Sequence, residues 1–230
     1  MLEDNLAKVK KNIENACRKA GRDPEEVTLV AVSKMKPLED IEVLRRIGQM
    51  EFGENYVQEL CEKEEHVSAP VHWHMIGHLQ TNKVKYILDK VVLIHSVDSV
   101  HLAKQIEKEA AKRNLTAQIL LQVNVAEEDT KFGMDTDEVI KMAEEISHFP
   151  HVHIRGLMTS APFVDDPEEN RCYFRKLHKL FVDIGDKNID NVTMDILSMG
   201  MPNDYEVAIE EGATMVRVGT CIFGERNYNK

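Results

Sequence analysis

Short apolar segments alternate with amphipathic helical patterns along the whole chain, and this alternation constrains the fold more than any other feature of the sequence. Several apolar segments are nearly continuous, as in residues 119–125, which is typical of parallel strands buried on both faces. Strands joined by helical crossovers predict an α/β fold with a parallel sheet. We expect strands near residues 28–34, 50–53, 71–77, 91–97, 117–125, 153–158, 193–198 and 214–219, and helices near residues 2–20, 38–48, 54–65, 80–89, 99–113, 135–147, 168–184 and 203–211.

Eight strands with helical crossovers predict a single (β/α)₈ barrel of the TIM type, with residues 1–230 forming one domain. Only seven of the expected helices fall between strands, and the 11 residues after Gly219 are too few for a full eighth helix. The extra N-terminal helix, near residues 2–20, could fill the gap beside the last strand. The alternative is a doubly wound open sheet, which would not need such a helix.

Composition narrows the class of partner. The net charge is −11, which argues against nucleic acid as a general partner because no excess of basic residues exists to neutralise phosphates. No apolar segment is long enough to cross a membrane, and the first residues form a polar pattern without a signal-peptide core. The cysteines have no metal-ligand spacing, so we expect reduced thiols in a cytoplasmic protein; they are Cys17, Cys61, Cys172 and Cys221.

Functional residues of such barrels gather at the C-terminal ends of the strands, and Lys34, Asn55 and His78 stand at or just past such ends in this sequence. Lys34 is the first candidate for chemistry. It ends the apolar run that begins at Val27. Burial at the end of a strand would lower the pKa of the amine and free it as a nucleophile that can form a Schiff base with an aldehyde. The alternative is that Lys34 is only the first polar residue of a surface loop.

A phosphate site is indicated after the last two strands. Ser198 and Gly200 follow the seventh strand, and Gly219 and Thr220 follow the eighth; these two loops commonly hold phosphate in barrels, and a helix beginning near residue 203 would add backbone N–H groups. The alternative is that both glycines serve ordinary turns. Neither a Walker motif nor a Gly-x-Gly-x-x-Gly motif occurs, so a P-loop or a Rossmann cofactor site is not supported.

Arg217 alternates with Met215 and Gly219 and is therefore expected to point into the barrel. Such an arginine needs a partner. We consider either an ion pair with Glu54 or Asp98, or donation to a ring nitrogen or phosphate of a ligand.

Histidines raise the question of a metal site. His72 and His74 share one strand face, as do His151 and His153, and this spacing opens the sites of some metal-dependent hydrolase barrels. However, the eighth strand offers an arginine and not a carboxylate, so we interpret these histidines as core or supporting residues and expect no metal. His78 differs because it follows the third strand and should face the site.

Five segments in the same order resemble the pyridoxal phosphate homeostasis proteins, which are similar to the N-terminal barrel of alanine racemase. The resemblance spans the chain. The segments are Val30-Ala-Val-Ser-Lys-Met-Lys-Pro37, Phe52-Gly-Glu-Asn-Tyr-Val-Gln-Glu59, Trp73-His-Met-Ile-Gly-His-Leu-Gln-Thr-Asn-Lys83, Leu197-Ser-Met-Gly-Met-Pro-Asn-Asp204 and Val216-Arg-Val-Gly-Thr-Cys-Ile-Phe-Gly-Glu-Arg226.

The resemblance implies that pyridoxal 5′-phosphate (PLP) is held as a Schiff base on Lys34, with Arg217 facing the pyridine nitrogen. It implies a pocket lined by Asn55 and His78. It also implies that phosphate is contacted by Ser198, Gly219 and Thr220 and by the backbone near Met199 and Gly200, and that Lys36, Lys83 and Lys131 assist PLP handling.

This site chemistry favours a carrier over an enzyme. Arginine stays protonated and can only donate, so the ring nitrogen stays unprotonated and PLP is a weaker electron sink. In alanine racemase a second base comes from a tyrosine on a C-terminal domain, whereas this sequence ends at Lys230. The resemblance therefore predicts a monomeric protein of PLP homeostasis or delivery, with apo-enzymes as possible recipients and little or no turnover. The alternatives are a PLP-dependent amino-acid racemase and a metal-dependent hydrolase.

Overall fold

Eight parallel strands close into a barrel in the computed structural model, which describes residues 1–126, 132–136 and 138–224. Each strand pairs with the next in the chain, and the last pairs with the first, as Val30 opposite Arg217 illustrates. The predicted barrel is therefore confirmed, and the open doubly wound sheet is excluded. The strands are β1 (Thr28–Val32), β2 (Glu51–Glu54), β3 (His72–Met75), β4 (Val91–Val97), β5 (Ala117–Gln122), β6 (Val152–Met158), β7 (Val192–Ser198) and β8 (Met215–Val218).

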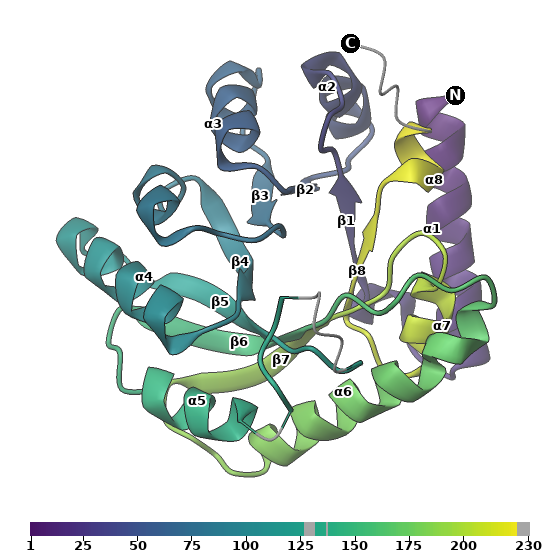
Figure 1. Cartoon of the computed structure of the whole chain (residues 1–230). Helices are drawn as coiled ribbons and strands as arrows, with labels where there is room; N and C mark the ends of the chain where they lie inside the picture. Colours follow the sequence, from purple (N-terminus) through teal and green to yellow (C-terminus); the bar gives the residue numbers. More distant parts are fainter. Residues whose placement is uncertain (127–131, 137, 225–230) are drawn as a thin grey trace.

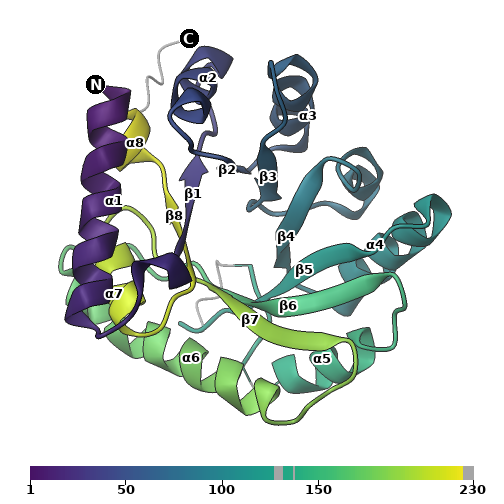
Figure 2. The ribbon, with the colours of Figure 1, turned by 180° about the vertical axis from the view of Figure 1, so that it is seen from behind.

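Helices surround the strands, as Figures 1 and 2 show from opposite sides. The α-helices are α1 (Leu2–Lys19), α2 (Leu38–Arg46), α3 (Val57–His66), α4 (Val100–Arg113), α5 (Val139–Ile146), α6 (Arg171–Gly185), α7 (Tyr205–Glu210) and α8 (Thr220–Phe223), and the 3₁₀ helices are η1 (Pro24–Glu26), η2 (Thr81–Tyr86) and η3 (Pro167–Asn170).

A helix is expected near residues 80–89, and the structure has the shorter 3₁₀ helix η2 there. It buries Val84 and is followed by the buried Ile87 and Leu88. Ser99 caps α4, since its hydroxyl accepts from the Leu102 N–H at 3.2 Å.

The N-terminal helix α1 lies beside α7 and the short α8, so it occupies the predicted gap next to β8 (Figures 1 and 2). Its amphipathic pattern buries Leu6, Val9 and Ile13, and each such side chain contributes about 1.5–3 kcal/mol when it is fully buried. The Asn5 side chain also donates to the Ile222 carbonyl at 3.0 Å. Helix α1 thus completes the helical layer beside the short α8 (Thr220–Phe223).

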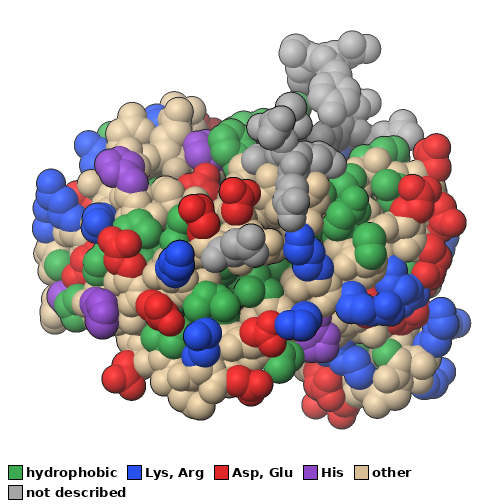
Figure 3. Space-filling view, turned by 60° about the horizontal axis from the view of Figure 1, so that its bottom comes forward, with side chains coloured by type: hydrophobic (Ala, Val, Ile, Leu, Met, Phe, Trp, Pro, Cys, Tyr) green, Lys and Arg blue, Asp and Glu red, His purple; other side chains and the backbone are tan. Residues whose placement is uncertain are grey.

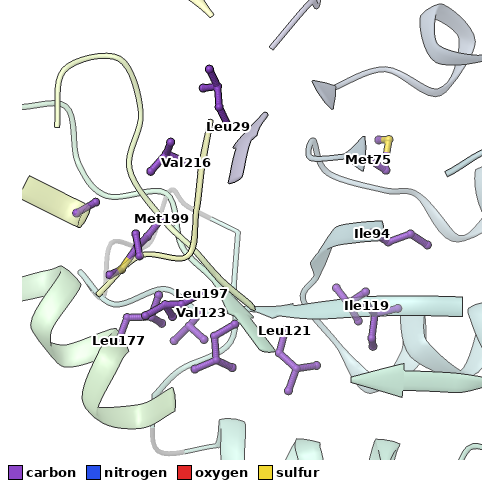
Figure 4. Close-up of a cluster of buried hydrophobic side chains, with 14 of the residues drawn as sticks. Leu29, Met75, Ile94, Ile119, Leu121, Val123, Leu177, Leu197, Met199 and Val216 are labelled. Carbon is purple, nitrogen blue, oxygen red and sulfur yellow. The ribbon is translucent and has the colours of Figure 1, made fainter. Parts of the chain in front are cut away.

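The core has two parts. Between strands and helices lies a large apolar layer, part of which is shown in Figure 4, where Leu29, Ile94, Ile119, Leu197 and Val216 are among the labelled side chains. Inside the barrel a smaller cluster fills the space between the strands. It comprises Val30, Leu93, Leu120, Met158 and Met215.

On the face shown in Figure 3, acidic and basic side chains are interspersed. Among the described residues, none of the helices combines the length and apolar character needed to span a bilayer.

Gly156 is required where β6 meets β7. Its φ is +151°, and a Cβ added there would lie 1.8 Å from the Ile196 carbonyl oxygen. Because backbone cannot move aside cheaply, we expect Gly156→Ala to lower the free energy of unfolding by about 3 kcal/mol or more. Urea denaturation of purified protein measures this change.

The matched control is Gly185→Ala at the end of α6, where a Cβ would meet only Met194 at 3.6 Å. This variant should match the wild type or be more stable by up to about 1 kcal/mol. Equal stability of both variants would contradict the steric argument.

Candidate functional site

A cavity of about 170 Å³ lies at the C-terminal ends of the strands. Its walls come from residues at or just beyond the ends of β1, β2, β3, β6, β7 and β8, as expected for a barrel of this type. The lining residues are Val32, Lys34, Asn55, Ile76, Ser160, Met201, Pro202, Arg217, Gly219 and Thr220.

A larger hollow of about 640 Å³ shares Asn55, Ile76 and Ser160 with this cavity. The two spaces therefore adjoin, and a ligand in the smaller cavity could be reached from the larger one. The remaining lining residues of the hollow are Tyr56, Val57, Gln58, Gly77, His78, Gln80, Lys83, Gln122 and Phe132.

Lys34 stands in a turn just after β1, where its side chain lines the smaller cavity. It is half-buried and not enclosed by the strand, so the expectation of deep burial was wrong: β1 ends at Val32, two residues earlier. The expectation that Lys34 faces a site at the barrel mouth agrees with its position. The following residue, Met35, has a φ of +59°, which marks a sharp turn.

A polar cluster holds the chain on both sides of Lys34. The Ser33 hydroxyl donates to Glu54 Oε1 at 2.6 Å, and the Lys63 ammonium donates to the Ser33 carbonyl at 2.7 Å. Lys63 also contacts Glu54 at 2.8 Å, with both side chains buried. Burial raises the pKa of Glu54, while Lys63 and Ser33 oppose that rise.

The other side of the turn is fixed by Glu59, which accepts from the Met35 N–H at 2.6 Å and from Lys63 at 2.7 Å. One ammonium therefore bridges two carboxylates and a backbone carbonyl. Because these contacts flank Lys34, they determine where its amine enters the cavity.

Arg217 points into the barrel, as predicted, and is 4% exposed. Its guanidinium donates to the Ser198 hydroxyl at 2.5 Å and to the Thr159 carbonyl at 2.8 Å. Burial lowers the pKa of Arg217 to about 10, partly opposed by Asp204. The side chain therefore stays charged at neutral pH.

Of the two alternatives considered for Arg217, the ion pair with Glu54 or Asp98 does not form. Glu54 is held by Lys63, and Asp98 lies 3.2 Å from His78. Arg217 instead lies against neutral oxygen acceptors, so its charge is not cancelled by a carboxylate in direct contact.

Gly219 and Thr220 line the same cavity just beyond β8, the strand that pairs with β1; Gly219 is half-buried and Thr220 is exposed. The structure thus brings together five of the predicted site residues around one space. They are Lys34, Asn55, Arg217, Gly219 and Thr220.

Residues 198–200, which the resemblance assigns to phosphate, do not line this cavity. Ser198 is buried, does not line the cavity, and has its hydroxyl between Arg217 and His95. The Met199 N–H donates to the Met215 carbonyl at 3.1 Å. Gly200 has a φ of +96°, and a Cβ there would lie 2.7 Å from the Ala208 Cβ, so it serves the close approach of α7.

Asn55 carries an unsatisfied group. Its Oδ1 is buried and has no hydrogen-bond partner among the residues that the structure describes. A buried acceptor without a donor costs about 1–3 kcal/mol. Since Asn55 lines both spaces, a ligand donor or a water molecule would remove this cost. Gly77 permits the arrangement, because a Cβ there would lie 2.4 Å from the Asn55 carbonyl oxygen.

His78 lies at the mouth of the larger hollow, where it stacks on Phe132 with ring centroids 4.0 Å apart. Lys83 lines the same hollow. Lys36, by contrast, donates to the carbonyls of Phe223 and Gly224, both at 3.1 Å, at the end of α8. Lys131 lies outside the described residues.

Of the histidines on β3 and β4, His74 and His95 lie in the interior and His72 is exposed. His74 and His95 are buried, and Glu51 contacts both His72 at 2.5 Å and His74 at 2.6 Å. Within the described ranges, no three His, Cys, Asp or Glu side chains are grouped so that they could hold a metal ion.

Thr159 and Ser160 were missed from the sequence. They directly follow β6, so they satisfy the same strand-end rule that selected Lys34 and Asn55. Met201 and Pro202 were missed because neither side chain carries a group that suggests a ligand.

The comparisons agree with this geometry. Residues 5–227 match the family model described as alanine racemase, N-terminal domain. The chain is 45% identical over 226 residues to the pyridoxal phosphate homeostasis protein of Aquifex aeolicus, with 98% of each chain covered. It is 36% identical to the protein of that name from Escherichia coli K12, with 98% of this chain and 97% of the relative covered.

Among solved structures, PipY of Synechococcus elongatus with PLP bound matches with a TM-score of 0.85 and 31% identity, over 97% of this chain and all of that one. Alanine racemase of Clostridium difficile shares the fold, with a TM-score of 0.73 at 16% identity, over 99% of this chain and 57% of the racemase.

The cluster beside Lys34 yields a stability prediction. Replacing Lys63 by Met leaves the Glu54 charge buried without its cation, and we expect a loss of about 3–5 kcal/mol in the free energy of unfolding at neutral pH. The folded variant binds a proton on Glu54 more readily than the unfolded chain does. Its stability relative to wild type should therefore recover as the pH falls through the raised pKa of Glu54.

Urea denaturation at several pH values measures both effects. The double variant Lys63→Met with Glu54→Gln removes the charge and should recover part of the loss. A loss that is the same at every pH, and that the second substitution does not reduce, would show that the buried charge is not its cause.

Proposed function

Because this chain belongs to the pyridoxal phosphate homeostasis protein family, we propose that it binds PLP beside Lys34 and serves to hold and deliver that cofactor. The observation that carries the proposal is the meeting of Lys34, Arg217, Gly219 and Thr220 around one cavity. These residues come from β1 and β8 and their loops, so only the closed barrel brings them together.

The residues present fit this group. PLP combines an aldehyde, a phenolic oxygen, a pyridine nitrogen and a phosphate. The cavity offers an amine on Lys34, a guanidinium on Arg217 and a hydroxyl on Thr220. The buried Asn55 Oδ1, which has no partner in the described part of the chain, adds an acceptor that a bound ligand or water could satisfy.

Bound PLP would supply an aldehyde that a lysine amine can capture as a Schiff base. We assign Lys34 to that capture, Arg217 to the ring nitrogen, and Gly219 with Thr220 to the phosphate. Ser198, expected from the resemblance to contact phosphate, is assigned instead to holding Arg217, since its hydroxyl accepts from that side chain at 2.5 Å.

Arg217 also favours a carrier over an enzyme. Its pKa of about 10 keeps it protonated at neutral pH, so it donates to a ring nitrogen but cannot give up a proton to it. An unprotonated ring withdraws electrons weakly. A protein with this arrangement would restrain a reactive aldehyde without strongly activating the substrates attached to it.

The visible spectrum tests the proposal. Purified protein mixed with PLP should gain a yellow absorption band that borohydride discharges, and Lys34→Ala should lack it. Lys179→Ala is the matched control, because that lysine is exposed and paired with Asp183 on α6; it should keep the band. A wild type that takes up no PLP, or a Lys34→Ala variant with an unchanged band, would refute the assignment.

Proton exchange at the Cα of alanine tests the alternative that the protein is an amino-acid racemase. With PLP-loaded protein and L- or D-alanine in deuterated water, we expect deuterium at Cα to rise no faster than with free PLP. Nuclear magnetic resonance of the alanine measures it. Exchange that depends on both the protein and Lys34 would favour an amino-acid racemase.

We further propose that the working unit is a monomer that passes PLP to apo-enzymes in the cytoplasm. The amine, guanidinium and hydroxyl assigned to PLP all stand on this chain, so the assigned contacts need no residue from a second copy. The four cysteines are free thiols, as a reducing compartment favours. Sedimentation of the loaded protein should give one chain per particle. Loaded protein should also reactivate a PLP-dependent apo-enzyme while an added scavenger removes free PLP.

A further inference from the structure

A line of polar side chains crosses the barrel interior and ends at Arg217. We call it the relay. It starts at the N-terminal end of β2, crosses β3 and β4, and reaches the ends of β7 and β8. Its members are Glu51, His74, His95, Ser198 and Arg217.

Every step of the relay is a hydrogen-bond distance. Glu51 Oε2 lies 2.6 Å from His74 Nε2, and His74 Nδ1 lies 2.9 Å from His95 Nε2. His95 Nδ1 lies 3.0 Å from Ser198 Oγ, which accepts from Arg217 Nη1 at 2.5 Å. The four inner members, His74, His95, Ser198 and Arg217, are at most 4% exposed, and His95 and Ser198 are 0% exposed.

The outer end is accessible. The Glu51 side chain is 25% exposed and is bound to His72, which is 55% exposed. Glu51 also borders a separate hollow of about 380 Å³ near α1 and η1, at the end of the barrel away from the PLP cavity. The relay therefore links the cavity to the opposite end of the barrel.

The hydrogen bonds of the relay can all donate in the same direction, from Arg217 toward Glu51. Burial, aided by the charge of Arg217, lowers the pKa of His95 well below its usual value, so this ring is neutral and has one donor and one acceptor nitrogen. Arg217 can only donate, so Ser198 Oγ accepts from it. The Ser198 hydroxyl then donates to His95 Nδ1, and His95 Nε2–H donates to His74 Nδ1.

At the far end His74 Nε2–H donates to the Glu51 carboxylate. With this arrangement, each donor and each acceptor of the relay has a hydrogen-bond partner. The reverse direction would make Ser198 accept from both His95 and Arg217, and its own hydrogen would then have no acceptor within the relay. Buried polar groups are rarely left in that state.

We propose that Glu51, His74 and His95 are positioning residues, which fix the Ser198 hydroxyl and through it the Arg217 guanidinium against the cofactor ring. This inference rests on the proposed function. It explains how the cavity holds a charged arginine without a carboxylate in contact with it: the acceptor is a neutral hydroxyl, and the nearest carboxylate of the relay is three hydrogen bonds further away.

Ligand-free protein tests the relay itself. Nitrogen NMR of ¹⁵N-histidine-labelled protein should show the rings of His74 and His95 with a proton on Nε2 and an unprotonated acceptor at Nδ1, as the hydrogen bonds of the relay require. Glu51→Gln should shift the signals of both rings, while Glu25→Gln, which borders the same outer hollow, should leave them unchanged. A His95 protonated on Nδ1, or His95 signals unmoved by Glu51→Gln, would overturn the relay.

PLP affinity tests the positioning role. His95→Leu removes the acceptor for Ser198 and should weaken PLP binding about tenfold, the size usual for losing a supporting hydrogen bond. His95→Gln keeps one acceptor and one donor and should return the affinity to within about threefold of wild type. His101→Leu, an exposed position on α4, is the control for removing a histidine.

Glu51→Gln keeps the inference testable if His95→Leu fails to fold, since Glu51 is only half-buried; it should also weaken PLP binding, by about threefold or more. Wild-type affinity in both Glu51→Gln and a folded His95→Leu would overturn the positioning role, as would a loss in His95→Leu that His95→Gln does not relieve. A wild type that binds no PLP would refute the proposed function, whereas the ring signals would still decide the relay.

Discussion

The charge of Arg217 is the constraint on which the rest of the site depends. A guanidinium that is 4% exposed inside a barrel is costly unless acceptors surround it. Two of its donors are taken up by Ser198 and the Thr159 carbonyl. The remaining face of the side chain borders the cavity, so an acceptor on a ligand would complete its surroundings. The fold thus holds a strong donor in place before any ligand arrives.

Two buried cations are held in contrasting ways. Lys63 is enclosed by two carboxylates and a carbonyl. All of these contacts stabilise the turn that carries Lys34. Within the described part of the chain, the hydrogen-bond partners of Arg217 are neutral oxygens, those of Ser198 and Thr159, and its charge stays available. One cation therefore shapes the wall of the cavity, and the other provides a binding group within it.

The barrel and the main site residues could be predicted from the sequence because both follow from local patterns. Alternating apolar and amphipathic segments indicated the strands, and the strand-end rule selected Lys34, Asn55, Gly219 and Thr220, all of which line the cavity. Side-chain partners could not be predicted in this way. The sequence suggested Glu54 or Asp98 for Arg217, but Lys63 and His78 take those carboxylates, and only the register of neighbouring strands decides which groups meet.

The same limit explains why Ser198 was assigned to the phosphate. In the sequence it lies directly before a glycine-containing loop, as a phosphate ligand would. In the barrel, Ser198 lies opposite Met215 in the β7–β8 register, and Met215 belongs to the apolar cluster inside the barrel. The Ser198 side chain therefore points to the same inward face, where it contacts His95 and Arg217. A polar residue that faces a mostly apolar interior must find its hydrogen-bond partners there. Ser198 therefore bonds to His95, which in turn contacts His74, and it does not take part in the loop that follows β7.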